Sequence, residues 1–314
     1  MREARWNFAF FARAAGLVGS VLLGAWQATA EPGVRHERVL AIGGAVTEIV
    51  YALGEQDRLV GRDSTSTYPP EAFALPDVGY IRALSPEGVL SVNPQLVLAR
   101  ENNGPPEAVE VLKSTGIVWV DVPDDFSPTG LDDNVRIIAD ALGVQQEGEA
   151  LRVKIAGDLA DVARATERIA SPKRAMFILS IRNGRILVGG RDTAADGILS
   201  LAGTENVFAE LEGYKPVSSE AILAAEPEVI LAMTGRGRGG SHSASDDAVT
   251  SHPALSLTPA VADGLVIRME GLYLLGFGPR TAEAALELAQ RIYGDALAAD
   301  AAPPRERSPG DAGG

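Results

Sequence analysis

The chain has 314 residues, no cysteine and a formal net charge of −14 at pH 7. Without cysteine it has neither a lipid-modified processing site nor disulfide bonds, so a packed core has to hold it together. The strongly acidic balance argues against nucleic acid and against anionic membrane surfaces as partners.

The first thirty residues have the pattern of an export signal. Three arginines accompany an apolar run over residues 14–26, and residues 28–30 read Ala-Thr-Ala, the small-x-small form of a cleavage site. The run has about 13 residues, whereas the alternative, a membrane-spanning anchor, needs about 20. We therefore expect a cleaved signal peptide over residues 1–30 and export to the periplasm. Because the signal carries three basic residues and one acidic residue, its removal changes the net charge from −14 to −16.

The mature chain predicts an α/β fold with parallel sheets. Residues 38–44 (RVLAIGG) form an apolar strand that ends in glycines, and residues 45–54 have helical spacing with Gly54 as a C-terminal stop. Residues 58–63 and 95–100 predict two further strands. Strands that alternate with helices along a chain are typical of parallel sheets.

An internal repeat predicts two lobes of like fold. Residues 84–99 (LSPEGVLSVNPQLVLA) match residues 217–232 (VSSEAILAAEPEVILA) without gaps, at an offset of 133 residues. Each copy reads as a serine-capped helix, a proline break and a buried strand. Two copies are too few for a solenoid, so we expect two similar lobes with a ligand cleft between them.

One long helix is expected between the lobes. Residues 144–169 contain no proline and have apolar residues at helical spacing, so they predict a helix of 26 residues that spans about 39 Å. A single helical connector predicts a smaller hinge motion than a pair of extended strands. The expected organisation is a signal peptide (1–30), an N-terminal lobe (31–143), a connecting helix (144–170), a C-terminal lobe (171–297) and a disordered tail (298–314).

Catalytic chemistry is hard to assemble from this sequence. It has no Gly-x-Ser-x-Gly elbow, no His-Glu-x-x-His motif and no cysteine nucleophile. The glycine cluster at residues 235–240 follows a strand, but no helix opens directly after it, as a dinucleotide site requires. We interpret it as a loop that offers Arg236 and Arg238 to an anionic ligand, or as a solvated loop without a role. The chain is not predicted to be an enzyme; an exported enzyme acting on a small anion is the alternative.

Several stretches together resemble the periplasmic haem-binding proteins of haem-uptake ABC transporters. They are IGGAVTEIVYALG, GRDSTSTYP, LPDVGYIRALSPEGVLSVNPQLVLA, AADGILSLAGTENVF and LLGFGPRTAEAALELAQRIYG, and the resemblance covers residues 37–294. The wider group of helix-linked substrate-binding proteins also includes binders of siderophores and cobalamin, and DVGYIR is the segment that points to haem. Binding of a ferric siderophore or cobalamin stays open, as does a haem scavenger without a transporter.

The resemblance implies that Tyr80 is the axial ligand of haem iron and that Arg82 is its basic partner. Ferric iron is a hard Lewis acid and phenolate is a hard oxygen ligand. A free tyrosine has a pKa of about 10, so the iron, and a guanidinium two residues away on the same side of an extended segment, have to favour the anion. Gly79 gives the backbone freedom to direct the ring outward. A partly buried ring at the cleft edge is the alternative for Tyr80.

The resemblance also implies the surroundings of the haem. Some members add a histidine after the strand that matches AMFILS, but here Ile181 and Arg182 stand in that place. We therefore expect five-coordinate ferric haem, unless His242 reaches the iron. The two propionates need basic partners and the porphyrin needs apolar or aromatic walls. The residues expected around the haem are Tyr68, Arg82, Arg182, Arg236 and Arg238.

The repeated acids Glu87 and Glu220 have a separate expected role. In the family, acids at these positions dock onto arginines of the dimeric permease, one lobe on each subunit. A matched pair of charges suits a two-fold partner, although each acid also complements its helix dipole. The expected partners are haem and an ABC transporter permease dimer, without nucleic acid or membrane insertion, and the protein itself is expected to be a monomer.

Overall fold

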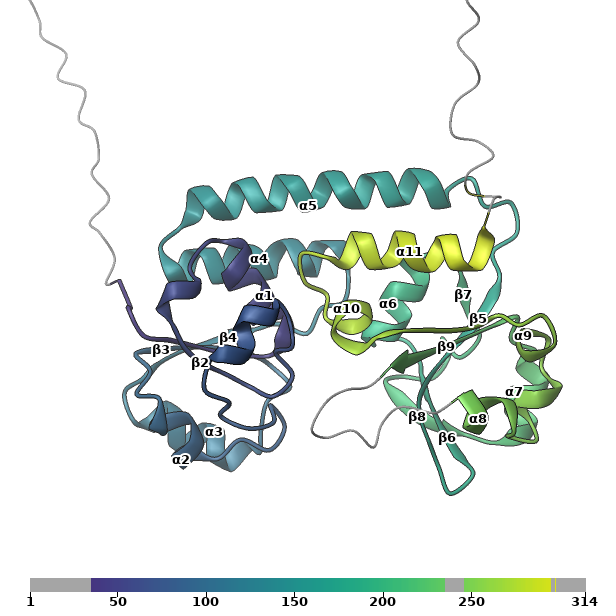
Figure 1. The fold of residues 1–314 in the computed structure, drawn as a ribbon, viewed down its shortest axis with the longest axis horizontal. Helices are drawn as coiled ribbons and strands as arrows, with labels where there is room; N and C mark the ends of the chain where they lie inside the picture. The colour runs from purple at the N-terminus through teal and green to yellow at the C-terminus, as the bar shows by residue number, and fades with distance from the viewer. Residues whose placement is uncertain (1–34, 235–245, 295–296, 298–314) are drawn as a thin grey trace, which may run out of the picture. The chain divides into compact units, whose positions relative to one another are not determined.

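The computed structural model describes residues 35–234, 246–294 and 297. The expected signal peptide and tail, and residues 235–245, lie outside this part of the chain. The described residues form an α/β structure with one four-stranded and one six-stranded sheet (Figure 1). None of their helices is both long and apolar enough to cross a membrane.

The N-terminal lobe is built on a sheet whose neighbouring strands are all parallel, as predicted. Its strands are β1 (Val39–Ile42), β2 (Leu59–Arg62), β3 (Leu96–Arg100) and β4 (Val118–Val122). They lie in the order β2-β1-β3-β4. β1 and β3 are buried along their whole length, which explains their nearly continuous apolar sequence, because central strands of a parallel sheet are covered on both faces.

Helices and short 3-10 turns connect these strands or follow the last of them. They are α1 (Gly44–Ala52), η1 (Gln56–Arg58), η2 (Pro70–Ala74), α2 (Pro86–Ser91), α3 (Pro106–Ser114) and α4 (Pro128–Leu142). The predicted end of α1 is close to the observed one, and Gly54 takes a left-handed φ of 78° just beyond it. α2, α3 and α4 each begin with proline, which lacks an amide that the first helical turn would leave unpaired.

The sheet of the C-terminal lobe is mixed, with a parallel part, as predicted, and an antiparallel part. Its strands are β5 (Arg174–Arg182), β6 (Arg185–Gly189), β7 (Glu205–Asn206), β8 (Tyr214–Val217), β9 (Val229–Thr234) and β10 (Val266–Glu270). β10, β9, β5 and β7 pair in parallel, whereas β6 runs antiparallel to both β5 and β8. The cause is Asn183-Gly184, whose φ angles of 50° and 71° close a two-residue hairpin between β5 and β6.

The helices of the C-terminal lobe surround this sheet. They are α6 (Ala194–Leu201), α7 (Ser219–Ala225), α8 (Asp246–Thr250), η3 (Leu255–Leu257), α9 (Pro259–Ala262), α10 (Gly271–Leu275) and α11 (Thr281–Tyr293).

The internal repeat is confirmed as a duplicated structural unit. Ser85 caps α2 by accepting a hydrogen bond from the Gly88 amide at 3.0 Å, and Ser218 caps α7 by accepting one from the Ala221 amide at 3.2 Å. Each helix is followed by a strand in the interior of its sheet, β3 in one lobe and β9 in the other. The same capping and burial chemistry therefore builds both copies.

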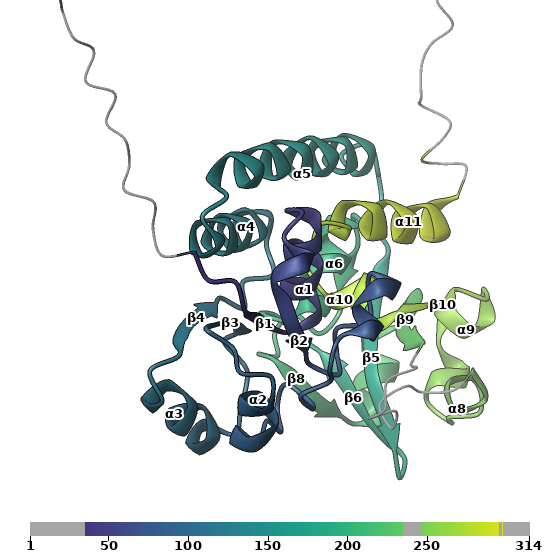
Figure 2. The same ribbon diagram turned by 60° about the vertical axis from the view of Figure 1, so that its left-hand side comes forward.

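A single helix, α5 (Gln145–Thr166), connects the lobes, as predicted. It has 22 residues, fewer than expected, because the Ile169 amide donates to the Thr166 carbonyl and turns the chain toward β5. α5 packs against α4 and α11 (Figure 2). One buried apolar cluster contains residues of both sheets and of these three helices.

Candidate ligand-binding site

A buried aspartate organises the carboxyl edge of the N-terminal sheet. Asp63, directly after β2, is fully buried. Its carboxylate accepts hydrogen bonds from the amides of Gly43 at 2.9 Å and Thr65 at 3.0 Å, and from the Ser66 hydroxyl at 2.8 Å. These bonds tie together the loops after β1 and β2. Ligands of open α/β sheets bind beyond the carboxyl ends of the strands, so this edge is the candidate site.

Residues 76–82 (PDVGYIR) are fixed against the end of β2 by backbone hydrogen bonds. The Val78 amide donates to the Arg62 carbonyl at 2.9 Å, and the Ser64 amide donates to the Gly79 carbonyl at 2.8 Å. The main chain is thus held on the sheet side up to Gly79. The residue that follows therefore leaves a fixed support at the edge of the sheet.

That residue is Tyr80, whose side chain is 43% exposed. The preceding Gly79 takes a φ of 108°, and a Cβ atom added there would meet no atom within 4 Å. The backbone conformation, and not crowding, is therefore what requires glycine at this position. This agrees with the expectation that Gly79 directs the ring outward.

The expected geometry between Tyr80 and Arg82 is wrong. The Ala83 amide donates to the Tyr80 carbonyl at 2.7 Å, which closes a turn in place of the expected extended segment. The alternation of side chains along a strand does not apply in a turn. Arg82 is exposed in this turn, so its relation to the phenol depends on the turn and not on strand periodicity.

Tyr214, in β8, is a residue of the C-terminal lobe that the sequence did not single out. Burial raises the pKa of Tyr214 to about 12, against the opposing influence of the Ala195 amide, the Thr193 hydroxyl and the positive charge of Arg82. Charges act over about 10 Å at moderate salt. The positive charge of Arg82 therefore reaches Tyr214 of the C-terminal lobe.

Tyr68, expected to stack on a porphyrin, already has a partner on its ring. The Arg280 guanidinium lies 3.5 Å from the centre of the Tyr68 ring. The same guanidinium forms a bidentate pair with Glu48 of α1, with Nε to Oε1 at 3.0 Å and Nη2 to Oε2 at 2.9 Å. Glu48 is 5% exposed. Tyr68 thus has one ring face in contact with a residue from the other lobe.

Arg100 is a second residue that the sequence did not single out. It ends β3, is 8% exposed, and donates from Nε to Asp124 at 2.6 Å. Its guanidinium lies 5.4 Å from the centre of the Phe126 ring, which packs edge-on against Phe277 of the C-terminal lobe. The signal in the sequence was a cation at the carboxyl end of a buried strand, since such a charge needs a buried partner.

Four further residues were expected around the haem: Arg182, Arg236, Arg238 and His242. Arg182 is exposed at the C-terminal end of β5. Arg236, Arg238 and His242 lie outside the described residues.

The predicted docking acids occupy equivalent positions. Glu87 and Glu220 are both exposed, and each is the second residue of its helix, α2 or α7. The pKa of Glu220 is lowered by hydrogen bonds from its own backbone amide and from the Ser218 side chain. An ionised acid at a helix N-terminus is the arrangement that the helix dipole favours.

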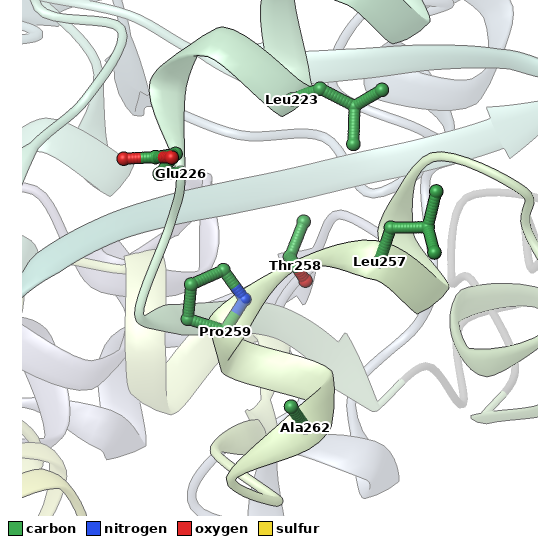
Figure 3. A pocket seen from close by; sticks show the side chains of 6 residues that line it. All are labelled: Leu223, Glu226, Leu257, Thr258, Pro259 and Ala262. Atoms are coloured by element: carbon green, nitrogen blue, oxygen red, sulfur yellow. The ribbon is translucent and has the colours of Figure 1, made fainter.

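A pocket of about 370 Å³ lies on the C-terminal lobe, between α7 and the chain from η3 to α9 (Figure 3). None of the residues expected around the haem lines it. Its lining residues are Leu223, Glu226, Leu257, Thr258, Pro259 and Ala262.

Comparison with known proteins identifies similar binding proteins. The apo form of the periplasmic haem-binding protein RhuT from Roseiflexus sp. RS-1 is 36% identical, with a TM-score of 0.76 over 83% of this chain and 98% of that chain. The haem-binding protein BhuT, solved with two haems, is 37% identical, with a TM-score of 0.74 over 83% and 98% of the two chains. A vitamin B12-binding protein of Vibrio parahaemolyticus is 27% identical over 82% of this chain and 89% of its own length.

The family model for a periplasmic binding protein matches residues 39–271, which include parts of both sheets. The similar solved structures cover most of this chain, so the predicted two-lobe, helix-linked fold is confirmed. Such proteins are ligand carriers for ABC permeases and not a class of enzymes. The chain belongs to the periplasmic binding protein family.

Proposed function

We propose that this chain captures ferric haem between its two lobes and delivers it to an ABC permease for import. Family membership supports the coarser statement, a substrate-binding protein of an ABC transporter. The observation that favours haem as the ligand is Tyr80, an exposed phenol on a fixed backbone support. The chain is also 36% and 37% identical to two haem-binding proteins.

Tyr80 is the proposed axial ligand of the haem iron. Phenolate is a hard oxygen donor that suits ferric iron. Because a free phenol has a pKa of about 10, the iron has to displace the proton on binding. Arg82, two residues on, brings a positive charge to the same turn.

The other haem contacts are proposed from the charge and the aromatic character of the side chains. Arg82, Arg182, Arg236 and Arg238 supply cations for the two propionates. Tyr68 offers the porphyrin at most one ring face, because Arg280 covers the other. The iron is five-coordinate on Tyr80 unless His242 supplies a sixth ligand.

Export and docking complete the proposal. Residues 1–30 are the proposed cleaved signal peptide, which places the mature protein, a monomer, in the periplasm. Glu87 and Glu220 are the proposed acids that pair with arginines of the permease. Both acids are exposed at equivalent helix starts, where a two-fold partner finds the same charge on each lobe.

Cobalamin is the second candidate ligand, because a vitamin B12-binding protein is similar over 82% of this chain. A ferric siderophore is a further candidate within the same family. Absorbance separates the three, since haem bound through tyrosinate has a Soret band that the other two ligands lack.

Haem titration of the mature protein beside Tyr80→Phe tests the proposal. Loss of a group that supports a metal ligand already costs about 10- to 100-fold in affinity, so loss of the ligand itself should weaken haem binding by at least about 100-fold. Tyr51→Phe is the matched control, because the Tyr51 ring of α1 packs against the apolar core. An unchanged spectrum and affinity in Tyr80→Phe would show that haem is not held by this residue. Binding of cobalamin without haem by the parent protein would establish the second candidate.

A further inference from the structure

The exposed leucines of the described chain lie beside the repeated acids. Among the described residues, three leucines have exposed side chains: Leu90 at 41%, Leu223 at 40% and Leu257 at 72%. Leu90 and Leu223 are equivalent positions of the internal repeat, each three residues after its glutamate. Leu257 lines the same pocket as Leu223. All three therefore belong to the two copies of one surface.

Helical spacing puts leucine and acid on the same side of each helix. Residues three apart in an α-helix are neighbours on its surface. α2 therefore presents Glu87 with Leu90, and α7 presents Glu220 with Leu223. A partner surface that fits both lobes therefore needs a cation beside an apolar side chain for each of the two helices.

The C-terminal copy is extended by the pocket between α7 and α9. Its apolar lining is Leu223, Leu257 of η3, and Pro259 and Ala262 of α9, and Glu226 and Thr258 add polar groups at its wall (Figure 3). Its volume is about 370 Å³, and it is open to a partner on the surface of the lobe. One large apolar side chain of a partner therefore fits there.

We propose that Leu90, Leu223 and the pocket beside Leu257 are the apolar part of the permease docking surface, with a large apolar side chain of one permease subunit seated in the pocket. The inference rests on the proposed function, because it takes the permease as the occupant. Charge selects that occupant. A second copy of the mature chain, with a net charge of −16 after removal of residues 1–30, would bring further negative charge against Glu87 and Glu220.

Glutamine substitutions test the surface, because glutamine keeps the size of leucine and removes its apolar character. The variants are Leu90→Gln, Leu223→Gln and Leu257→Gln, and the probe is the cognate permease and ATPase complex in lipid nanodiscs. We expect permease affinity to fall about tenfold in Leu223→Gln and Leu257→Gln, and less in Leu90→Gln, because Leu90 does not line the pocket. Val153→Gln is the matched control, since Val153 is 64% exposed on α5. Haem titration and urea denaturation should match the parent protein in all four variants.

The outcomes separate this inference from the function on which it rests. Parental permease affinity in all three leucine variants would overturn the apolar surface and leave haem capture intact. Absence of haem binding by the parent protein would overturn the proposed function instead. A dimer of the parent protein in analytical ultracentrifugation that Leu223→Gln dissociates would show that a second copy covers the surface, which also overturns the inference.

Discussion

At Gly79 the backbone alone sets the direction in which Tyr80 leaves the sheet. The φ of 108° there is strained for any residue with a Cβ, although no atom within 4 Å would oppose one. We expect Gly79→Ala to lower the free energy of unfolding by about 1 to 2 kcal/mol and to weaken haem binding, because Tyr80 is redirected. Gly54→Ala is the control, with a φ of 78° and equally open surroundings. Urea denaturation should show similar losses for both, and haem titration a loss for Gly79→Ala alone.

The residues of the site differ in how far the sequence reveals them. Gly79 and Tyr80 could be predicted because their geometry is set within one short segment. The turn at Arg82 could not, since PDVGYIR has no turn signature after its glycine. Arg100 could have been found by asking where a cation at the end of a buried strand finds its partner.

At the scale of elements, an ion pair joins α1 to the start of α11. Glu48 and Arg280 are 232 residues apart in sequence, and the carboxylate is buried. Removing one partner of a buried pair leaves the other charge uncompensated. We expect Glu48→Gln to lower the free energy of unfolding in urea by about 3 kcal/mol.

The control for this pair is Asp133→Asn on α4. Asp133 pairs with Arg136, and both side chains are about half exposed, so the free energy of unfolding should fall by less than about 1 kcal/mol. If Glu48→Gln and Asp133→Asn lowered the free energy of unfolding equally, the pair between the lobes would not stabilise the fold more than a surface pair.

Local patterns predicted β1, α1, β3 and α5 because each has its own apolar periodicity and end signals. They did not predict the antiparallel β6, although Asn183-Gly184 is a hairpin signal between two strand-like runs. The contact between Glu48 and Arg280 has no local signal, because each residue alone reads as a surface charge.

At the scale of the whole molecule, two acids on equivalent helices are the proposed contacts with the permease. We expect the double variant Glu87→Lys with Glu220→Lys to keep haem affinity and to lose haem transfer to the permease, because like charges then meet at both lobes. Haem transfer is measured with the permease in nanodiscs, as the loss of the Soret band from the binding protein. The control is Glu147→Lys with Glu167→Lys, both exposed on or next to α5, which changes net charge equally. Equal transfer by both double variants would show that docking does not use the repeated acids.

The apolar cluster shared by the two lobes predicts that they unfold together. It contains Val39 and Leu98 of the first sheet, Phe177 and Leu231 of the second, and Leu288 of α11. Neither lobe expressed alone would bury its share of this cluster. The chain should therefore unfold in a single transition, and a destabilising substitution in one lobe weakens the other to the same extent. Engineering of either lobe thus has to be judged by the stability of the whole.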